Sequence, residues 1–375
     1  MRVPRIGLAV AVSIMIVLAA CSTTPGGSVT LTKVRLQLQW FPQAQFAGYY
    51  AAASKGYYTA EGLDVTIIPG SADIAPQVVG SAANGPEFTL SWVPKVLQAR
   101  ESDAGSDLVN IAQVFQRAGT LSVSWKSSNI TTPADFRGKK VGAWGFGNEL
   151  EVIASAKKAG LDPATDFTQV TQGFSMDELI AAYDGCAAAD TDCVDVAEAM
   201  IYNEYAQLLE TKNPTTGALF QPSDLNVIDY NKVGTAMLQD AVWARAAWLA
   251  AGTNKDTAVK FLRASFKGWI YCRDNPADCE QILVAAGTTL GAGHQKWMMN
   301  EINALIWPSP DGIGMLNAAA WAQTVDTALA AGIIAAAPPD TAFRTDLATS
   351  ALDGLDNATG TDFHKAVVEI TPGGE

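Results

Sequence analysis

The sequence predicts an α/β protein built from two lobes, and three observations support this. Expected strands alternate with expected helices over much of the chain, which is typical of parallel sheets flanked by helices. The alternation restarts near residues 119–125, as though a second sheet began there. The chain has 375 residues, which exceeds the roughly 250–300 residues that one hydrophobic core usually serves.

The first lobe begins with an amphipathic strand. Residues 33–40 alternate apolar and polar side chains, which is the period of a half-buried strand. Further strands are expected over residues 63–68, 87–92 and 107–116, and helices over residues 46–55, 73–82 and 94–101. Gly56 and the pair Pro69-Gly70 end two of these segments, as glycine and proline commonly do.

The second lobe continues the alternation with shorter elements. Helices are expected over residues 132–138, 148–159 and 175–183, and strands over residues 139–144, 166–171 and 226–230. Residues 194–209 should hold a short strand and a helix. After Gly234 the pattern becomes helical, over residues 256–272, 276–285, 294–305, 318–331 and 341–355.

These elements define the expected domain organisation. Lobe 1 comprises residues 33–121 and 238–356, and lobe 2 comprises residues 122–237. Two crossings between the lobes, near residues 120–124 and 233–240, would form a hinge that closes around a ligand. The remaining residues, 357–375, should form a flexible tail.

The N-terminus indicates export. Two arginines among the first five residues precede an apolar run that ends at Ala20, as in a secretory signal peptide over residues 1–20. The run is shorter than the roughly 20 residues that span a bilayer. Leu18-Ala-Ala-Cys21 resembles the bacterial lipobox, so we expect a lipidated Cys21, a linker over residues 21–32 and anchoring on the extracytoplasmic face of the cell membrane. The alternative is an ordinary signal peptide with an incidental cysteine.

The composition is acidic. Removing the two arginines of the signal peptide reduces the basic residues from 25 to 23 against 38 acidic ones, a formal charge near −15. Nucleic-acid binding depends on clustered lysine and arginine, so this charge argues against such a partner. A solvated acidic surface is compatible with a small neutral ligand. We expect a monomer without a cofactor or a metal. No Walker loop or dinucleotide fingerprint stands out.

Four cysteines remain after Cys21, in two local pairs of equal spacing: Cys186 with Cys193, and Cys272 with Cys279. In an oxidising compartment this spacing favours two local disulfides that each close a polar loop. Four cysteines allow three connectivities, and the sequence leaves the crossed ones open. Metal binding is the weaker interpretation, because neither of the two histidines lies near a cysteine pair at zinc spacing.

Several segments resemble the SsuA/thiamine-precursor-binding-like family of ABC transporter solute-binding proteins, within the thiamine pyrimidine synthase-like superfamily. The resemblance extends over residues 34–355. It is carried by the segments LQWFPQAQFAGYY at 38–50, KGYY at 55–58, EGLDV at 61–65, GKKVG at 138–142 and YNE at 202–204. Gln43-Ala44-Gln45 and residues 114–117 are similar to the riboflavin-binding branch.

The resemblance implies a fold and a function. It implies a periplasmic-binding-protein-like fold of type II, in which two α/β lobes are joined by a two-crossing hinge. It further implies capture of a small aromatic heterocycle, riboflavin-like or a thiamine pyrimidine precursor, for delivery to an ABC permease and its ATPase. One branch of the superfamily contains enzymes that build the thiamine pyrimidine. The cysteine-rich motif of those enzymes is absent from this sequence, so we do not expect an enzyme.

Candidate ligand-binding residues lie at the ends of expected strands, where ligands of open α/β sheets bind. Trp40 and Trp92 close two strands of lobe 1 and could stack on a heterocycle, an interaction worth about 1–3 kcal/mol per ring. Core packing is the alternative for both tryptophans. In lobe 2 a strand is followed by a glycine-rich turn that could offer backbone N–H groups, and its members are Gly145, Phe146, Gly147 and Asn148. Asn148 could instead be only a helix cap.

The family resemblance adds a third group, Tyr202, Asn203 and Glu204. In the resembling pyrimidine binders an aromatic side chain and a carboxylate from this region hold the ring and its amino group. For Glu204 the alternative is a solvated charge on a helix face.

Three other functions make different demands on the sequence. An alkyl sulfonate or nitrate-like anion would require a cation aimed into the cleft, and Arg117 is the candidate. An enzyme resembling thiamine pyrimidine synthase would require His294 or His364 in the cleft. A surface adhesin or structural lipoprotein would lack aromatic side chains in a cleft. For Trp307, in a proline-rich loop, the alternatives are a position in the cleft and a packing role, and packing is favoured.

Overall fold

The computed structural model describes residue 1, residues 30–102 and residues 106–375. The expected signal peptide, apart from its first residue, and Cys21 lie outside the described residues. Leu31–Glu375 forms one unit, which contains both expected lobes. Among the described helices, none combines the length and the hydropathy that crossing a membrane requires.

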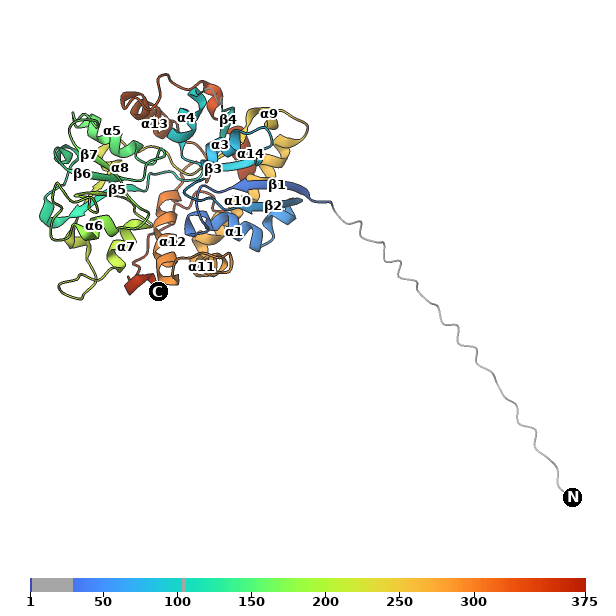
Figure 1. Ribbon diagram of the computed structural model, residues 1–375. Helices are drawn as coiled ribbons and strands as arrows, with labels where there is room; N and C mark the ends of the chain where they lie inside the picture. The colour runs from blue at the N-terminus through green and yellow to red at the C-terminus, as the bar shows by residue number, and fades with distance from the viewer. Residues whose placement is uncertain (2–29, 103–105) are drawn as a thin grey trace. The chain divides into compact units, whose positions relative to one another are not determined.

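The larger sheet has five strands in the order β2-β1-β3-β10-β4 (Figure 1). The strands are β1 (Thr32–Gln37), β2 (Leu63–Ile68), β3 (Phe88–Ser91), β4 (Leu108–Gln113) and β10 (Ala241–Arg245). β2 and β3 run parallel to β1, whereas β10 lies antiparallel between β3 and β4. The mainly helical elements expected after Gly234 do not include β10. All five residues of β10 are buried, so its sequence shows no alternation that would reveal a strand.

Helices cover both faces of this sheet and complete lobe 1. They are α1 (Ala47–Ser54), α2 (Tyr57–Ala60), α3 (Pro76–Ser81), α4 (Val93–Glu101), α9 (Ala246–Leu249), α10 (Asn254–Asp274), α11 (Pro276–Ala285), α12 (Ala292–Ile306), α13 (Ala318–Ala330) and α14 (Asp346–Leu352). α1 packs against α10, while α3 packs against β3 and β10. The expected helices after β10 are confirmed, although α14 is shorter than expected.

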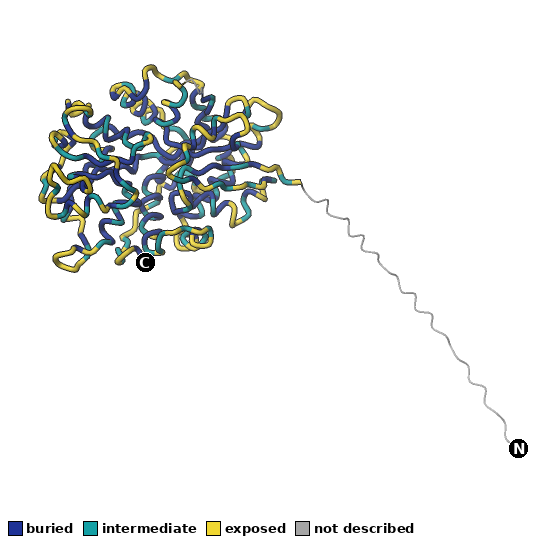
Figure 2. Tube along the Cα trace, in the orientation of Figure 1, coloured by how far each residue is buried: buried dark blue, intermediate teal, exposed yellow. Residues whose placement is uncertain are grey.

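Lobe 2 holds the remaining strands and helices α5 (Leu150–Lys158), α6 (Asp177–Ala181), α7 (Glu204–Glu210) and α8 (Tyr230–Val233). Its strands are β5 (Thr120–Trp125), β6 (Lys140–Ala143), β7 (Thr168–Thr171), β8 (Ala197–Met200) and β9 (Leu225–Asp229). They form the sheets β8-β5-β9 and β6-β7, and a parallel bridge between Val141 and Val196 connects the two. In both lobes the strands are mostly buried and the loops exposed (Figure 2).

The chain passes between the lobes twice, from β4 to β5 and from β9 to β10. The boundary expected at residue 121 falls inside β5, so the first crossing lies slightly earlier than expected. Gln239 connects the two crossings: its Oε1 accepts from the backbone N–H of Gly119 at 2.8 Å, and its Nε2 donates to Thr120 Oγ1 at 2.5 Å. Two crossings held together in this way are the connection that the sequence pattern predicts.

Both local disulfides are confirmed. Cys186 is bonded to Cys193 in a loop of lobe 2, and Cys272 is bonded to Cys279. The second bond joins the end of α10 to the first turn of α11. The crossed connectivities that the sequence left open do not occur.

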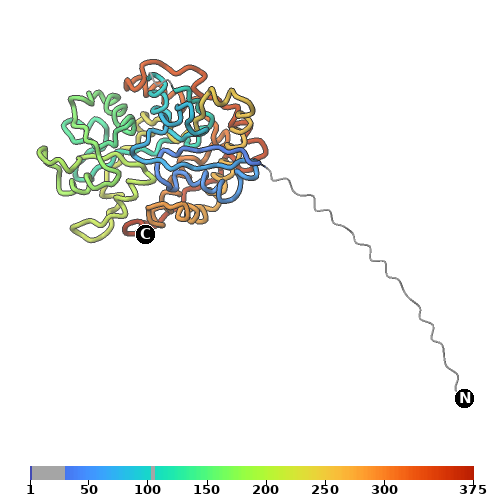
Figure 3. Tube along the Cα trace, turned by 45° about the vertical axis from the view of Figure 1, so that its right-hand side comes forward, coloured from blue at the N-terminus to red at the C-terminus, as the bar shows by residue number. Residues whose placement is uncertain are grey.

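The C-terminal residues differ from the expected flexible tail. Residues 357–375 lie beside α12, and Figures 1 and 3 both show the C-terminal end next to this helix. Asn300 of α12 exchanges two hydrogen bonds with the backbone of Ala366, and Lys365 forms an ion pair with Glu301. The sequence gives no hint of this packing, because a segment held by side chains of another element needs no periodicity of its own.

Candidate functional site

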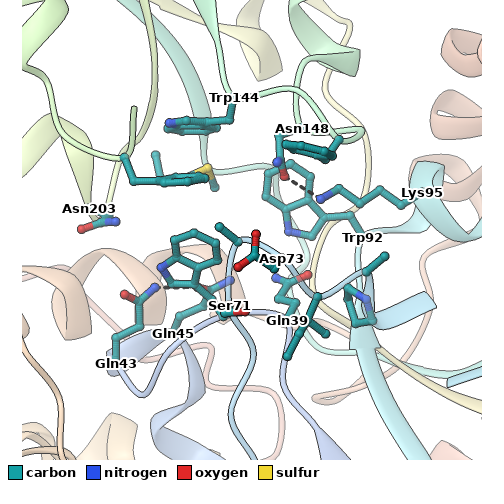
Figure 4. A pocket seen from close by; sticks show the side chains of 18 of the residues that line it. Gln39, Gln43, Gln45, Ser71, Asp73, Trp92, Lys95, Trp144, Asn148 and Asn203 are labelled. Atoms are coloured by element: carbon teal, nitrogen blue, oxygen red, sulfur yellow. Dashed lines mark hydrogen bonds between the residues drawn. The ribbon is translucent and has the colours of Figure 1, made fainter. Parts of the chain in front are cut away.

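A cavity of about 300 Å³ opens between residues of the two lobes (Figure 4). This volume is at the lower end of the roughly 300–1,000 Å³ of typical small-molecule sites. Six aromatic side chains line it: Trp40, Trp92, Trp144, Phe146, Phe174 and Tyr202. Four of them stand at or just beyond the carboxyl ends of β1, β3, β6 and β8, which is where open α/β sheets bind ligands.

Trp40 lies half-buried at the boundary between the lobes. Its ring centroid is 4.6 Å from that of Phe174 in lobe 2, with the planes tilted by 53°. The neighbouring Phe41 packs edge-on against Trp40 at 5.3 Å. The structure therefore places Trp40 in the cavity wall, where it could contact a ligand.

Trp92 is more deeply buried and is fixed by a hydrogen bond. Its indole N–H donates to Asp240 Oδ1 at 2.9 Å. The ring still lines the cavity. Trp92 is therefore both a buried packing residue and part of the cavity wall. Trp144, at the end of β6, is held in a similar way through its N–H, which donates to the carbonyl oxygen of Gly173 at 3.0 Å.

The glycine-rich turn contributes side chains to the cavity, and its two glycines do not line it. Three successive residues, Gly145, Phe146 and Gly147, have positive φ angles of 74°, 56° and 83°. This conformation presents Phe146, 82% exposed, at the cavity. The backbone N–H of Gly147, one of the groups expected to face a ligand, donates to Glu149 at 2.9 Å within the protein.

Asn148 lines the cavity and bridges the two lobes. Lys95 Nζ of α4 donates to Asn148 Oδ1 at 2.6 Å, and Asn148 Nδ2 donates to the Gly145 carbonyl at 2.8 Å (Figure 4). The expected alternative role of Asn148 as a helix cap is not observed, because Glu149 occupies the cap position of α5. The Lys95–Asn148 hydrogen bond is thus a direct polar link across the cleft.

Tyr202, Asn203 and Glu204 all line the cavity, at the start of α7. Tyr202 is buried against Phe115 with an edge-on ring contact. Glu204 is buried rather than solvated, and burial raises the pKa of its carboxyl to about 7. Its two oxygens accept from the backbone N–H of Met200 at 2.9 Å and from Asn203 Nδ2 at 2.6 Å. The carboxylate expected to hold a ligand amine is therefore already hydrogen-bonded within the protein.

One cation lines the cavity among the described residues, and it is Lys95 rather than Arg117. Arg117 donates to the backbone carbonyls of residues 304, 305, 307 and 308, outside the cavity. The Lys95 ammonium lies 4.8 Å from the centre of the Trp92 ring. Burial lowers its pKa to about 8, against the opposing effect of Glu149, Glu198 and Asp240.

The sequence model of the NMT1/THI5-like family matches residues 43–279, more than half of the chain. The chain belongs to this family. The riboflavin-binding protein RibY of Chloroflexus aurantiacus is 25% identical over 352 residues, which cover 88% of this chain and 93% of that protein. A formylaminopyrimidine-binding protein of Halalkalibacterium halodurans is 26% identical over 272 residues, 71% of this chain and 74% of that protein.

Solved structures confirm the fold class. The periplasmic aliphatic sulphonate binding protein SsuA of Escherichia coli superposes with a TM-score of 0.54, at 16% identity, over 79% of this chain and 85% of that one. At this identity the likeness concerns the fold alone. The NMT1/THI5-like chain thus has the two-lobed periplasmic-binding-protein fold that the sequence resemblance implied.

The chain is also similar to proteins named as enzymes. A 4-amino-5-hydroxymethyl-2-methylpyrimidine phosphate synthase of Aspergillus parasiticus is 26% identical over 254 residues, 65% of this chain and 68% of that protein. In the present chain neither histidine lines the aromatic cavity. His294 is buried between Glu210 and Asn203, with ring nitrogens 2.9 Å from the oxygens of both, and His364 is exposed. Among the described residues, no group of three or more His, Cys, Asp or Glu side chains is placed to hold a metal.

Several lining residues were missed by the sequence reasoning: Gln39, Gln43, Gln45, Lys95, Trp144 and Phe174. Trp144 ends an expected strand, so the rule that selected Trp40 and Trp92 applies to it equally. Gln43 and Gln45 were noted only as marks of the family resemblance. Phe174 and Lys95 carry no local signal, because a phenylalanine in a loop and a lysine on a helix are common on any surface. Trp307 is a packing residue, as expected, beneath the guanidinium of Arg273.

Proposed function

We propose that this chain is an extracytoplasmic solute-binding protein of an ABC importer, which captures a small aromatic heterocycle between its lobes. The heterocycle would then be delivered to a permease and its ATPase. The single observation that carries this proposal is the cavity with six aromatic side chains, drawn from both lobes. RibY and the formylaminopyrimidine-binding protein, whose names state aromatic heterocyclic ligands, support it.

The chemistry of the cavity favours a flat, largely uncharged ring. Stacking on an aromatic side chain contributes about 1–3 kcal/mol per ring. Trp40 of lobe 1 and Trp144 of lobe 2 each offer such a face. Lys95 is accompanied in the cavity by Asp73 and by the buried Glu204, so the charged groups do not form a uniformly positive site.

The proposal predicts ligand-dependent stabilisation of the wild-type protein. A ligand that binds only the folded state stabilises it by about 2.7 kcal/mol at a hundredfold excess over Kd. Riboflavin, 4-amino-5-hydroxymethyl-2-methylpyrimidine, taurine and nitrate should be compared by thermal shift and tryptophan fluorescence. We expect one heterocycle to raise the melting temperature and quench the emission, and taurine and nitrate to do neither. A response to neither heterocycle would refute the proposed ligand class.

The second candidate is a binding protein for alkyl sulfonates or nitrate-like anions. The observation that favours it is the position of Lys95, a residue of α4 that lines the cavity and carries an ammonium group. In the same screen this function predicts a response to taurine or nitrate that is lost in the variant Lys95→Met. An enzyme related to the fungal synthases is less well supported, since the cavity holds no histidine for proton transfer.

We also propose that the protein is lipid-anchored through Cys21, on the basis of the Leu-Ala-Ala-Cys sequence that ends at this residue. Replacing Cys21 by serine removes the thiol that would be lipidated. The variant should move from the membrane fraction to the soluble fraction, which immunoblotting of fractionated cells would measure. Lys260→Ala, at an exposed residue far from the N-terminus, is the control and should stay with the membranes. Retention of the Cys21→Ser protein on membranes would exclude the anchor.

A further inference from the structure

Asp240 is a buried carboxylate at the end of the second crossing, and it receives hydrogen bonds from neutral donors. Gln39 Nε2 donates to Oδ1 at 2.6 Å, and the Trp92 indole N–H donates to the same oxygen at 2.9 Å. Gln45 Nε2 donates to Oδ2 at 2.9 Å. Burial raises the pKa of Asp240 to about 6, so the carboxylate is ionised at neutral and higher pH.

An ionised carboxylate can only accept hydrogen bonds, and this fixes the orientation of the neighbouring amides. Gln39 and Gln45 must each turn their NH₂ group toward Asp240, because their oxygens would be repelled. The Gln45 oxygen then points away from Asp240, and it accepts from Gln43 Nε2 at 2.7 Å. This bond in turn uses one N–H of Gln43. Asp240 thereby sets the orientation of Gln39 and Gln45 directly, and that of Gln43 through Gln45.

The consequence reaches the cavity, which Gln39, Gln43 and Gln45 all line on the side facing Trp144 and Asn148 (Figure 4). Within the described part of the chain, no protein group donates to Gln39 Oε1 or to Gln43 Oε1. On the opposite side, by contrast, both ends of the Asn148 amide and both oxygens of Glu204 are already hydrogen-bonded. The oxygens of Gln39 and Gln43 are therefore free acceptors at fixed positions, beside the second N–H that each amide retains.

We propose that Asp240 is a positioning residue that fixes the oxygens of Gln39 and Gln43 as free acceptors of the site, so that the site favours rings presenting N–H or NH₂ donors to these two oxygens. This inference rests on the proposed capture of a heterocycle and names the chemical class of ring within it. Asp73, a further acceptor when ionised, lines the same cavity and adds to the preference. A ring whose donor is replaced by a methyl group would leave the glutamine oxygens without a partner and would clash with them.

The test compares matched ligands that differ in one donor. Riboflavin is paired with N3-methylriboflavin, and 4-amino-5-hydroxymethyl-2-methylpyrimidine with its 4-dimethylamino analogue. Affinities are measured by titration calorimetry at pH 8, where Asp240 is ionised. The wild-type protein should bind the donor-bearing member of at least one pair more tightly by tenfold or more. In Asp240→Asn the preference should fall below about threefold, because the asparagine amide can donate and lets the Gln39 amide reverse.

Two further variants keep the test decisive if Asp240→Asn does not fold. Gln39→Leu and Gln43→Leu leave Asp240 in place and remove one acceptor each, so each should reduce the preference and spare most of the stacking affinity. A purely structural role of Asp240 would weaken both members of a pair equally and leave their ratio unchanged. An unchanged ratio in all folded variants, or equal wild-type affinity within a pair, overturns the inference. If the wild-type protein binds no member of either pair, the proposed function itself fails, and the inference fails with it.

Discussion

Replacing Gly268 by alanine should destabilise the protein by about 3 kcal/mol or more, at the upper end of the usual cost of overpacking a core. Gly268 lies where α10 crosses α1. A Cβ atom at this position would be 2.0 Å from the carbonyl oxygen of Gly48 and 2.9 Å from the backbone nitrogen of Ala52. Both are backbone atoms, so the two helices would have to separate. The better helix propensity of alanine, about 1 kcal/mol, offsets only part of this cost.

Thermal unfolding followed by circular dichroism measures this effect. The melting temperature of Gly268→Ala should fall by on the order of 5 °C or more. Lys260→Ala is the matched control, because Lys260 is exposed on the same helix and such surface changes usually stay within about 0.5 kcal/mol. A Gly268→Ala protein that melts with the wild type would show that α1 and α10 do not approach as closely as described.

The fold could be predicted wherever one face of an element is solvated. β1 alternates apolar and polar residues, and the long helices α10 and α12 carry an apolar face, so periodicity locates all three. β10 could not be found in this way, because all its residues are buried and it lies between β3 and β4 inside the sheet. β10 is antiparallel to its neighbours because the chain returns from lobe 2 to lobe 1 just before this strand. Such a return depends on tertiary packing and leaves no local signal in the sequence.

The site was predictable to the extent that it depends on strand ends. Trp40 and Trp92 were selected because they end expected strands, and both line the cavity. The polar part depends on which side chains meet across the cleft, and neither Lys95 with Asn148 nor Asp240 with the glutamines is close in sequence. For Glu204 the position in the cavity was expected, but its hydrogen bonds to Met200 of β8 and to Asn203, just before α7, were not.

Replacing Trp40 by alanine should weaken binding of an aromatic heterocycle about ten- to a hundredfold. Loss of one stacking face costs about 1–3 kcal/mol, and each 1.4 kcal/mol is a factor of ten in Kd. Trp40 also contacts Phe174 of lobe 2, so its removal takes away an aromatic contact that joins the two lobes beside the ligand. The fold should persist, because Trp40 is only half-buried and lies at the edge of the lobe 1 core.

Titration calorimetry with the heterocycle identified by the screen measures this loss, since tryptophan fluorescence is itself altered by removing Trp40. Phe41→Ala is the control: Phe41 is the adjacent aromatic residue, it is exposed, and it is not among the described residues that line the cavity. Its affinity should stay within about threefold of the wild type, because it stacks on no ligand and only borders Trp40. If Trp40→Ala keeps the wild-type affinity, or if Phe41→Ala loses as much, the ligand does not stack where the cavity places it.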